Sequence, residues 1–165
     1  MLNYFQFIPY MPLQCVEISV INNPKLLASV IYKNFEHLAQ YPELEHNPPA
    51  IEKLLLNPEG INFLIYHENR IIAYMIGDKR YLDDHRYVYY ISYLYVVAKH
   101  RNKNLGSYLI RRAIKKCRDI GISFILLSCH RNNERGNRFY LKHGFNLDPI
   151  LGRINPNQNV FCLYL

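Results

Sequence analysis

Residues 90–145 read YISYLYVVAKHRNKNLGSYLIRRAIKKCRDIGISFILLSCHRNNERGNRFYLKHGF, and this stretch decides the fold. It predicts a strand, a basic turn, an amphipathic helix, a second strand and a second helix. The turn, RNKNLG at residues 101–106, opens directly into a helical spacing of apolar side chains: Leu109, Ile110, Ala113, Ile114 and Cys117. A strand that feeds such a turn presents backbone N–H groups and the positive end of a helix dipole to an anion. The stretch therefore predicts an anion-binding turn at the start of a helix.

The second helix of this stretch carries a further motif, in which Asn133, Gly136 and Tyr140 are followed by the pair Gly144-Phe145. Together the two motifs resemble the Gcn5-related N-acetyltransferase (GNAT) family, whose signature is Arg/Gln-x-x-Gly-x-Gly/Ala followed by Asn-x-x-Ala-x-x-hydrophobic-Tyr and a Gly-Phe pair. The resemblance is close over residues 90–145 and looser elsewhere. It implies an enzyme that transfers the acetyl group of acetyl-CoA to an amine, but it does not identify the acceptor.

The resemblance implies a single-domain α/β fold, with a central mixed β-sheet of about seven strands flanked by about four helices. This domain is expected to span residues 14–165, after an N-terminal extension of residues 1–13. The residue patterns predict strands at 14–20, 61–67, 71–81, 87–97, 123–129, 145–147 and 159–165. They predict helices from Asn22 through about Ala39, and at 50–56, 105–120 and 134–143.

The basic turn is the expected binding site for the phosphates of coenzyme A. Main-chain N–H groups would donate to the pyrophosphate from Asn102, Lys103, Asn104, Leu105, Gly106 and Ser107. The side chains of Arg101 and Lys103 would add positive charge. Asn104 stands where the family has its first glycine, and Asn adopts a left-handed backbone more readily than most residues, so we expect the turn to keep its conformation. The alternative is a basic surface loop that only caps a helix.

The second helix is expected to supply the acid for the reaction. Gly136 and Tyr140 lie one turn apart on one helical face, where a small residue lets the pantetheine arm approach and a phenol reaches the thioester sulfur. In the family, the matching tyrosine protonates the departing thiolate, which makes Tyr140 the candidate general acid. Asn133 matches a cofactor-contacting asparagine of the family. The alternatives are a core aromatic role for Tyr140, beside Phe139, and a helix-start role for Asn133.

The strand before the basic turn ends in four residues that match the splayed strand of the family, where backbone groups bind pantetheine and polarise the thioester carbonyl: Leu94, Tyr95, Val96 and Val97. We expect a backbone N–H near Val96 to stabilise the oxyanion. Related enzymes often carry a glutamate earlier on this strand as general base, but the positions here are Tyr90 and Ser92, neither of which is a base at neutral pH. The sequence offers other candidates without choosing among them: Asp83, Asp84, His85 and His130. Proton transfer through water and an amine that arrives neutral are the further alternatives.

The net charge of +7 is concentrated in one segment. Residues 99–118 hold eight cations and no acid, whereas the remaining 12 cations face 13 acids. Such a patch serves either nucleic acid or one polyanionic cofactor. We expect coenzyme A to use it; a basic nucleic-acid-binding domain and a non-catalytic CoA-binding regulatory module are the alternatives. Acids cluster instead at Glu43 and Glu45 and at Asp83 and Asp84, in loops that border the acceptor in this family, so we expect a primary amine that is cationic in solution.

Composition argues against several other classes of protein. No apolar run approaches the roughly 20 residues that span a bilayer, and the N-terminus lacks the features of a signal peptide, so a cytoplasmic protein without a membrane partner is expected. The four cysteines are scattered and are expected to be reduced thiols. The seven histidines lack the spacing of zinc sites, so no metal is expected. The oligomeric state, monomer or homodimer, stays open.

Overall fold

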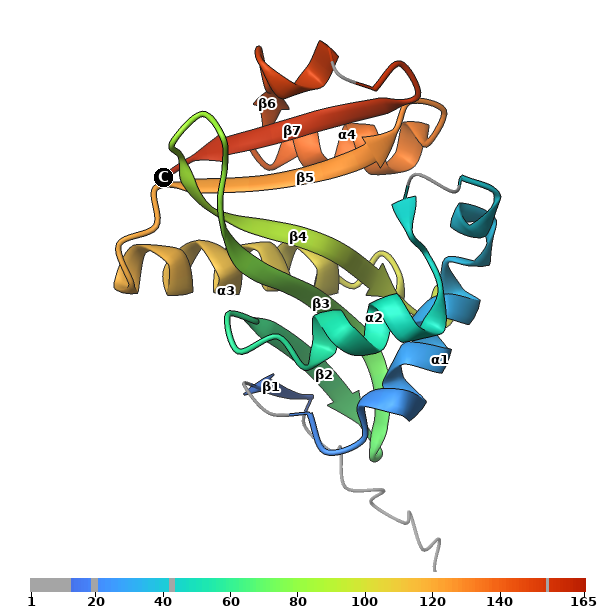
Figure 1. Cartoon of the computed structure of the whole chain (residues 1–165). Helices are drawn as coiled ribbons and strands as arrows, with labels where there is room; N and C mark the ends of the chain where they lie inside the picture. Colours follow the sequence, from blue (N-terminus) through green and yellow to red (C-terminus); the bar gives the residue numbers. More distant parts are fainter. Residues whose placement is uncertain (1–12, 19–20, 42–43, 154) are drawn as a thin grey trace, which may run out of the picture.

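The computed structural model describes residues 13–18, 21–41, 44–153 and 155–165. These residues form one open, mixed β-sheet of seven strands in the order β1-β2-β3-β4-β5-β7-β6, with helices on both faces (Figure 1). The strands are β1 (Gln14–Ile18), β2 (Asn62–His67), β3 (Arg70–Tyr81), β4 (Tyr87–Val96), β5 (Phe124–His130), β6 (Asn146–Leu147) and β7 (Gln158–Tyr164). The predicted fold class is confirmed. The predicted N-terminal extension falls almost wholly outside the described residues.

The α-helices of the described residues pack on the sheet in two pairs. They are α1 (Pro24–Asn34), α2 (Pro48–Leu55), α3 (Leu105–Asp119) and α4 (Glu134–Lys142), and 3-10 turns lie at η1 (Glu36–Gln40), η3 (Ala98–His100) and η4 (Leu151–Arg153). Helices α1 and α2 bury one face in a core that includes Tyr74 and Ile76, whereas α3 and α4 pack on the other face around Leu109 and Phe145 (Figure 1). None of the described helices has both the length and the apolar character that crossing a membrane requires.

Side-chain caps and turn residues explain where several elements begin. Asn23 accepts a hydrogen bond from the Leu26 N–H at 3.1 Å, and Asn47 accepts one from the Ala50 N–H at 2.9 Å, so that Asn caps α1 and α2 alike. Each cap is followed by proline in the first turn, where its missing N–H costs nothing. The second cap was not predicted, and α2 therefore starts two residues earlier than expected.

The first helix ends earlier than predicted. The expected helix runs to about Ala39, but the α-helix stops at Asn34 and the 3-10 turn η1 follows. Phe35 leaves the helical backbone with φ of −122°, and its ring packs against Tyr93 and Tyr95, with centroids 5.1 and 5.7 Å away. Tertiary packing of this aromatic side chain on β4 overrides the local helical pattern.

The pairing of β4 with β5 positions the site. These strands run parallel, and their ladder stops at the pair Ile91↔Leu127. Beyond that pair both strands continue without bonding to each other, and they diverge (Figure 1). A bulge at Ser92, opposite the step from Ile76 to Gly77 on β3, bends β4 where the divergence begins. The sheet is therefore open at the carboxyl ends of its two central strands.

Candidate functional site

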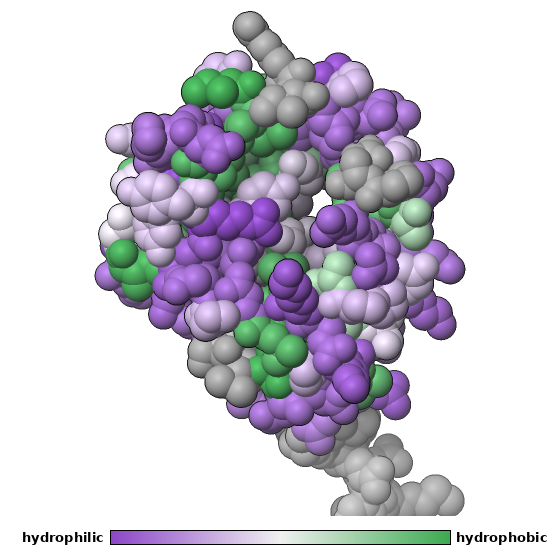
Figure 2. All heavy atoms as spheres, in the orientation of Figure 1, coloured by the Kyte–Doolittle hydropathy of each residue, from purple (hydrophilic) through white to green (hydrophobic). Residues whose placement is uncertain are grey.

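A cavity of about 1010 Å³ lies between the diverging strands. Its walls come from η1, the segment that follows η1, α2, β4, β5 and α4, and it is visible as a hollow near the middle of the face in Figure 2. Aromatic side chains make up much of the lining, including Phe35, Tyr41, Tyr90, Tyr93 and Tyr140. The volume is that of a small-molecule binding site.

The open edge of β4 presents backbone groups to this gap. The Val97 N–H donates to the Ile72 carbonyl of β3 at 2.9 Å. Because backbone direction alternates along a strand, the N–H groups of Leu94 and Val96 then point away from β3 and toward the gap. The predicted segment 94–97 is thus divided, with alternate residues bonded to β3 and the others free to donate to a carbonyl or an oxyanion.

The basic turn has the backbone conformation that was expected. Asn102 and Asn104 are both left-handed, with φ of 61° and 60°. Asn104 is the N-cap of α3, but its side chain makes no capping hydrogen bond and the first turn contains no acid. The N–H groups from Leu105 to Ser107 have no helical acceptor, and together with the helix dipole they give this turn an arrangement that suits an anion.

The two cations of this turn differ in what they contact. Arg101 folds back on β4, where its Nε donates to the Val96 carbonyl at 2.9 Å and its guanidinium lies 5.7 Å from the centre of the Tyr95 ring. Lys103 is exposed. Arg101 therefore braces the turn against the strand, a role that the sequence did not indicate, and Lys103 is the freer of the two charges.

The start of α3 is fixed by contacts with α4. A Cβ at Gly106 would lie 3.1 Å from Cζ of Phe139, so any larger residue there would require the Phe139 ring to shift. His143 Nδ1 lies 2.8 Å from the Phe139 carbonyl and His143 Nε2 lies 2.9 Å from the Ser107 hydroxyl. A carbonyl only accepts, so Nδ1–H donates to it and Nε2 of the neutral ring accepts from Ser107. The two sequence motifs are thus held together directly.

Tyr140 reaches the cavity from α4. Its ring packs edge-on against Phe139 and Phe145, with centroids 5.4 and 5.7 Å away. Within the described residues its hydroxyl has no hydrogen-bond partner, although it lines the cavity. Burial, with smaller effects of Cys129 and Tyr90, raises the pKa of Tyr140 well above its usual range. The phenol therefore stays protonated at neutral pH and is free to donate.

Asn133 and Gly136 have structural roles at the start of α4. Asn133 caps the helix, because its Oδ1 accepts from the Gly136 N–H at 2.9 Å. A Cβ at Gly136 would lie 2.7 Å from Asn133 Nδ2 and 2.9 Å from Cys129 Sγ. A Cβ here would have to displace both side chains, so the local packing favours glycine for a reason that differs from the expected approach of pantetheine. Asn133 also lines the cavity.

Tyr90 and Ser92 contact Arg80, whose charge is compensated by an ion pair with Asp78. Arg80 Nε donates to both carboxylate oxygens of Asp78, at 2.9 and 3.1 Å, and a second nitrogen donates to Ser92 Oγ at 3.3 Å. The guanidinium lies 4.2 Å from the centre of the Tyr90 ring. The Tyr90 hydroxyl donates to Ser128 Oγ at 2.8 Å. These contacts place hydroxyl groups and a neutralised ion pair, without a free carboxylate, on this wall.

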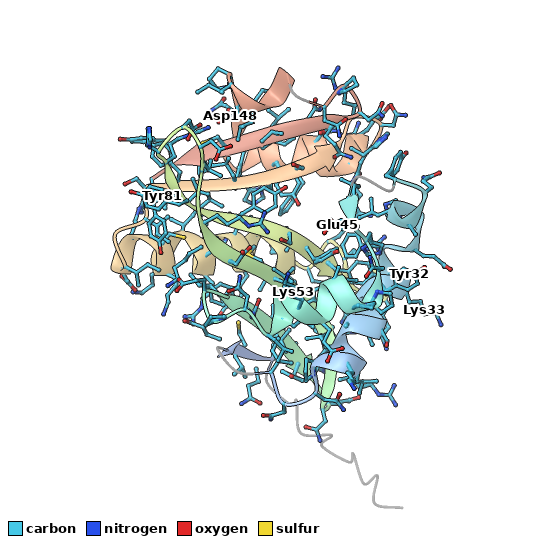
Figure 3. All side chains as sticks on the ribbon, in the orientation of Figure 1. Tyr32, Lys33, Glu45, Lys53, Tyr81 and Asp148 are labelled. Atoms are coloured by element: carbon cyan, nitrogen blue, oxygen red, sulfur yellow. The ribbon has the colours of Figure 1, made fainter. Side chains whose placement is uncertain are left out.

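Three of the four candidate bases lie away from the cavity. Asp84 pairs with Arg86 at 2.6 Å, and Arg86 also binds the buried Asp148 at 2.6 Å. Neither Asp84 nor its neighbours Asp83 and His85 line the cavity. Their turn precedes β4, whereas the cavity opens where β4 ends; Figure 3 labels Asp148 far from the cavity residue Glu45. The predicted acids of this turn thus do not line the cavity, because turn composition does not reveal at which end of a sheet the turn lies.

His130 and Glu45 do line the cavity. His130 Nδ1 accepts from the Asn132 N–H at 3.2 Å, and its Nε2 lies 3.1 Å from the Tyr41 hydroxyl. Glu45 is exposed at the edge of the hollow (Figure 3). The predicted acid Glu43 lies outside the described residues.

Sequence reasoning missed two residues. His46, in the segment before α2, is only 6% exposed and contacts the Tyr93 hydroxyl at 2.9 Å. Asn137 donates from its amide to three carbonyls around the start of α4, and its oxygen accepts from Asn159 at 3.0 Å. A lone histidine in a loop carries no spacing signal, since its partner is 47 residues away. An asparagine within a helical pattern likewise does not indicate that its side chain will bond to the carbonyls of the preceding loop.

The site thus combines anion donors at a helix start, an open strand edge and an unpaired phenol. This arrangement fits a thioester with phosphates at its far end, and it defines the class of acyl-CoA-dependent acyltransferases. The model of the Acetyltransferase (GNAT) family matches residues 28–145, and the chain belongs to this family. It is accordingly an acyltransferase, as the sequence motifs predicted.

Known relatives agree with this placement. An uncharacterised N-acetyltransferase of Mycobacterium tuberculosis is 23% identical over 116 residues, which cover 68% of this chain and 70% of the relative. Among solved structures, the PaiA N-acetyltransferase of Thermoplasma acidophilum in complex with coenzyme A has a TM-score of 0.70 at 16% identity, and the match covers 94% of this chain and 100% of that one. NAA60 of Arabidopsis thaliana in complex with a bisubstrate analogue has a TM-score of 0.71 at 12% identity, with 92% and 99% covered. At these identities the structures show a shared fold.

Proposed function

We propose that the protein transfers the acetyl group of acetyl-CoA directly to a primary amine, with Tyr140 as general acid. The observation that carries this proposal is that Tyr140 lines the cavity at the open edge of β4 and that its hydroxyl has no hydrogen-bond partner within the described residues. A protonated, unpaired phenol at that point is suited to donating a proton to a leaving thiolate.

The donor half of the site consists of backbone groups. The N–H groups of Leu105, Gly106 and Ser107 bind the phosphates, with Lys103 adding charge and Arg101 holding the turn to β4. The N–H groups of Leu94 and Val96 orient the pantetheine arm and stabilise the oxyanion. Because these donors belong to the main chain, they are in place before the substrate arrives.

Direct transfer needs no nucleophile from the protein. Cys129 lines the cavity, but burial raises the pKa of its thiol to about 11, so almost none of it is thiolate at neutral pH. All four cysteines are free, which suits the reducing cytoplasm that we propose as its location. We expect no acetylated enzyme in the intact mass after incubation with acetyl-CoA alone.

The acceptor half of the site suits a cationic amine. Glu45 carries an exposed carboxylate at the cavity edge, and the faces of Phe35 and Tyr93 line the interior. Arg80 also lines this region, but its pairing with Asp78 at 2.9 Å compensates its charge. An ammonium group in the cavity is thus attracted by Glu45 and is not repelled by an uncompensated Arg80.

The basic segment around α3 is assigned to coenzyme A and not to nucleic acid. Lys115 pairs with Asp119 at 2.7 Å and Lys116 pairs with Glu17 at 2.6 Å, so part of the segment is already compensated. The free donors of the turn at the start of α3 suit one polyphosphate ligand better than a long duplex. Tight binding of DNA or RNA at physiological salt in saturating coenzyme A would contradict this assignment.

The test is a thiol-release assay with acetyl-CoA and a panel of primary amines, aminoglycosides and peptides. We expect acetyl-CoA alone to stabilise the fold by about 2.7 kcal/mol at 100 times its dissociation constant, and at least one amine to accelerate thiol release. Tyr140→Phe should lower turnover by about 10²-fold, the low end for acid catalysis, with little change in acetyl-CoA affinity. Stabilisation without turnover on any acceptor would overturn the proposed reaction, and wild-type turnover in Tyr140→Phe would assign the proton to water.

A further inference from the structure

A buried histidine–tyrosine pair lies in the acceptor half of the cavity. His46 and Tyr93 both line it, and His46 Nδ1 lies 2.9 Å from the Tyr93 hydroxyl. The His46 ring stacks on Tyr32 with centroids 5.2 Å apart and an interplanar angle of 19°, while its Nε2 lies 3.3 Å from the Tyr32 carbonyl. The ring is therefore held by Tyr32 at Nε2 and by the Tyr93 hydroxyl at Nδ1.

The partners of His46 determine its tautomer. Because the Tyr32 carbonyl only accepts, the hydrogen of the neutral ring is on Nε2. Nδ1 then carries the lone pair and accepts the hydroxyl hydrogen of Tyr93. A proton added to Nδ1 breaks neither contact, since the Nδ1–H then donates back to the Tyr93 oxygen. The pair is built to exist in two protonation states with the same geometry.

We propose that Tyr93 and His46 form a proton relay that deprotonates the ammonium group of the acceptor, an inference that rests on the proposed function. The N–H bond of the ammonium breaks and its proton passes to the Tyr93 oxygen, as the Tyr93 hydroxyl proton passes to His46 Nδ1. The products are a neutral amine, an intact Tyr93 phenol and a His46 imidazolium, and no other reactant is needed. Tyr93 touches the acceptor, and His46 acts through Tyr93.

Burial shifts the pKa values of His46 and Tyr93 in the directions that the relay requires. Removal from water lowers the pKa of His46, with the charge of His37 acting in the same direction and the Tyr32 carbonyl opposing it. The ring is therefore neutral and able to accept at pH 7. Burial raises the pKa of Tyr93 to about 12, so the phenol relays a proton and does not act as a base by itself.

The surroundings of the relay contain few charges. The segment before His46 contributes Glu45, η1 contributes His37 and β3 contributes the compensated Arg80. Helix α2 lines the cavity with apolar residues only: Ala50, Ile51 and Leu54. Lys33, at the end of α1, points outward in Figure 3. Among the described residues, no carboxylate bonds to the His46 ring, whose partners are the Tyr93 hydroxyl and the Tyr32 carbonyl, and this favours release of the imidazolium proton to solvent after transfer.

His130 does not offer the same path. Its Nδ1 already accepts the Asn132 N–H at 3.2 Å, so the hydrogen of the neutral ring is on Nε2, beside the Tyr41 hydroxyl. Taking up a proton at Nδ1 would break the contact with Asn132. Of the two cavity histidine–tyrosine pairs, only the one at His46 has its lone pair directed at the phenol.

The test compares two acceptors of similar shape. 2-Phenylethylamine is an ammonium ion at neutral pH, whereas phenylhydrazine is uncharged there and needs no deprotonation before attack. Acetyl transfer to each is followed by thiol release in the wild type, Tyr93→Phe and His46→Gln. Tyr74→Phe is the matched control, because it removes a buried phenol on the same core whose partner, the Asn34 amide at 3.0 Å, does not titrate.

We expect both relay variants to lower kcat/KM for 2-phenylethylamine by about 10²-fold at pH 7 and to recover as the pH rises, because more of the amine is then neutral. We expect phenylhydrazine to be acetylated at nearly the wild-type rate, and Tyr74→Phe to behave as wild type with both. Equal losses with both acceptors would overturn the relay while leaving acetyl transfer in place. No thiol release by the wild type with any amine would overturn the proposed function and the relay together.

A second readout does not depend on turnover. In ¹⁵N-labelled protein at pH 7, the His46 ring should be neutral with its hydrogen on Nε2, and Tyr93→Phe should change the Nδ1 chemical shift. A ring that is charged at pH 7, or that carries its hydrogen on Nδ1, would overturn the relay whichever acceptors are used.

Discussion

Ser107 Oγ lies 2.9 Å from His143 Nε2, and this hydrogen bond joins the first turn of α3 to the C-cap residue of α4. One helix carries the anion-binding turn and the other carries Tyr140, so the contact links the two halves of the donor site. Ser107 and His143 are 36 residues apart in the chain.

Breaking this contact should weaken the fold and the donor site together. Ser107→Ala and His143→Phe should each lower the free energy of unfolding by about 1 kcal/mol, the usual net value of one hydrogen bond, and in a double-mutant cycle the pair should couple by a similar amount. Urea unfolding of the four proteins measures this coupling. Additive effects would show that the hydrogen bond is not formed in solution.

Lys103, in the turn before α3, should contribute more to coenzyme A binding than the lysines of α3 itself. Lys103→Ala should weaken affinity about tenfold, since a charge-assisted hydrogen bond contributes about 1.5 kcal/mol. Lys115→Ala is the control, because Lys115 pairs with Asp119 near the far end of the helix and should have no effect. Calorimetry at two salt concentrations checks both variants. Equal losses in the two would place the phosphates along the helix face and not at its start.

Asn104 should matter for its backbone and not for its side chain. With φ of 60°, Asn104→Gly should keep or tighten coenzyme A binding, because glycine adopts this conformation freely and removes side-chain bulk. Asn104→Ala should weaken binding, because the left-handed conformation costs alanine about 1 kcal/mol. A marked loss of affinity in Asn104→Gly would identify the side chain as a ligand.

His46 should make the stability of the fold depend on pH. Its pKa in the folded state is lowered below the usual 6.5, so under acidic conditions the unfolded chain binds a proton that the folded chain resists. Stability from this group is complete above about pH 6.5 and falls as the pH drops below that value. Between about pH 7.5 and 5.5, the free energy of unfolding measured by chemical denaturation should therefore fall less for His46→Gln than for the wild type. Identical losses would contradict a neutral, buried His46.

The sequence predicted the order of elements well because its signals are local. The left-handed turn at Asn104, the helix that follows it and the unpaired phenol of Tyr140 all lie in a stretch where spacing and turn chemistry agree. The acceptor half was not predictable in the same way. His46 meets Tyr93 across 47 residues of chain, and α1 ends before Phe35, whose ring packs against the same tyrosine.

The charge pattern of the sequence also did not show where its charged residues lie in space. Asp83 and Asp84 were expected beside the acceptor, but their turn precedes β4 while the cavity lies where that strand ends. Arg101 is expected to contribute charge, and its Nε also donates to the Val96 carbonyl, a contact that the charge pattern does not indicate. In each case the sequence gives the charge of the residue. The residues that it contacts depend on the direction of the strand and the reach of the side chain, which the sequence does not show.

The central claim is that the acetyl donor binds between β4 and β5 with its thioester at Tyr140, and a crystal structure with coenzyme A tests it most directly. We expect the pyrophosphate on the N–H groups from Leu105 to Ser107, pantetheine along the open edge of β4, and the sulfur within hydrogen-bonding reach of the Tyr140 hydroxyl. Phosphates bound elsewhere on α3, or a sulfur that lies away from Tyr140, would contradict the account.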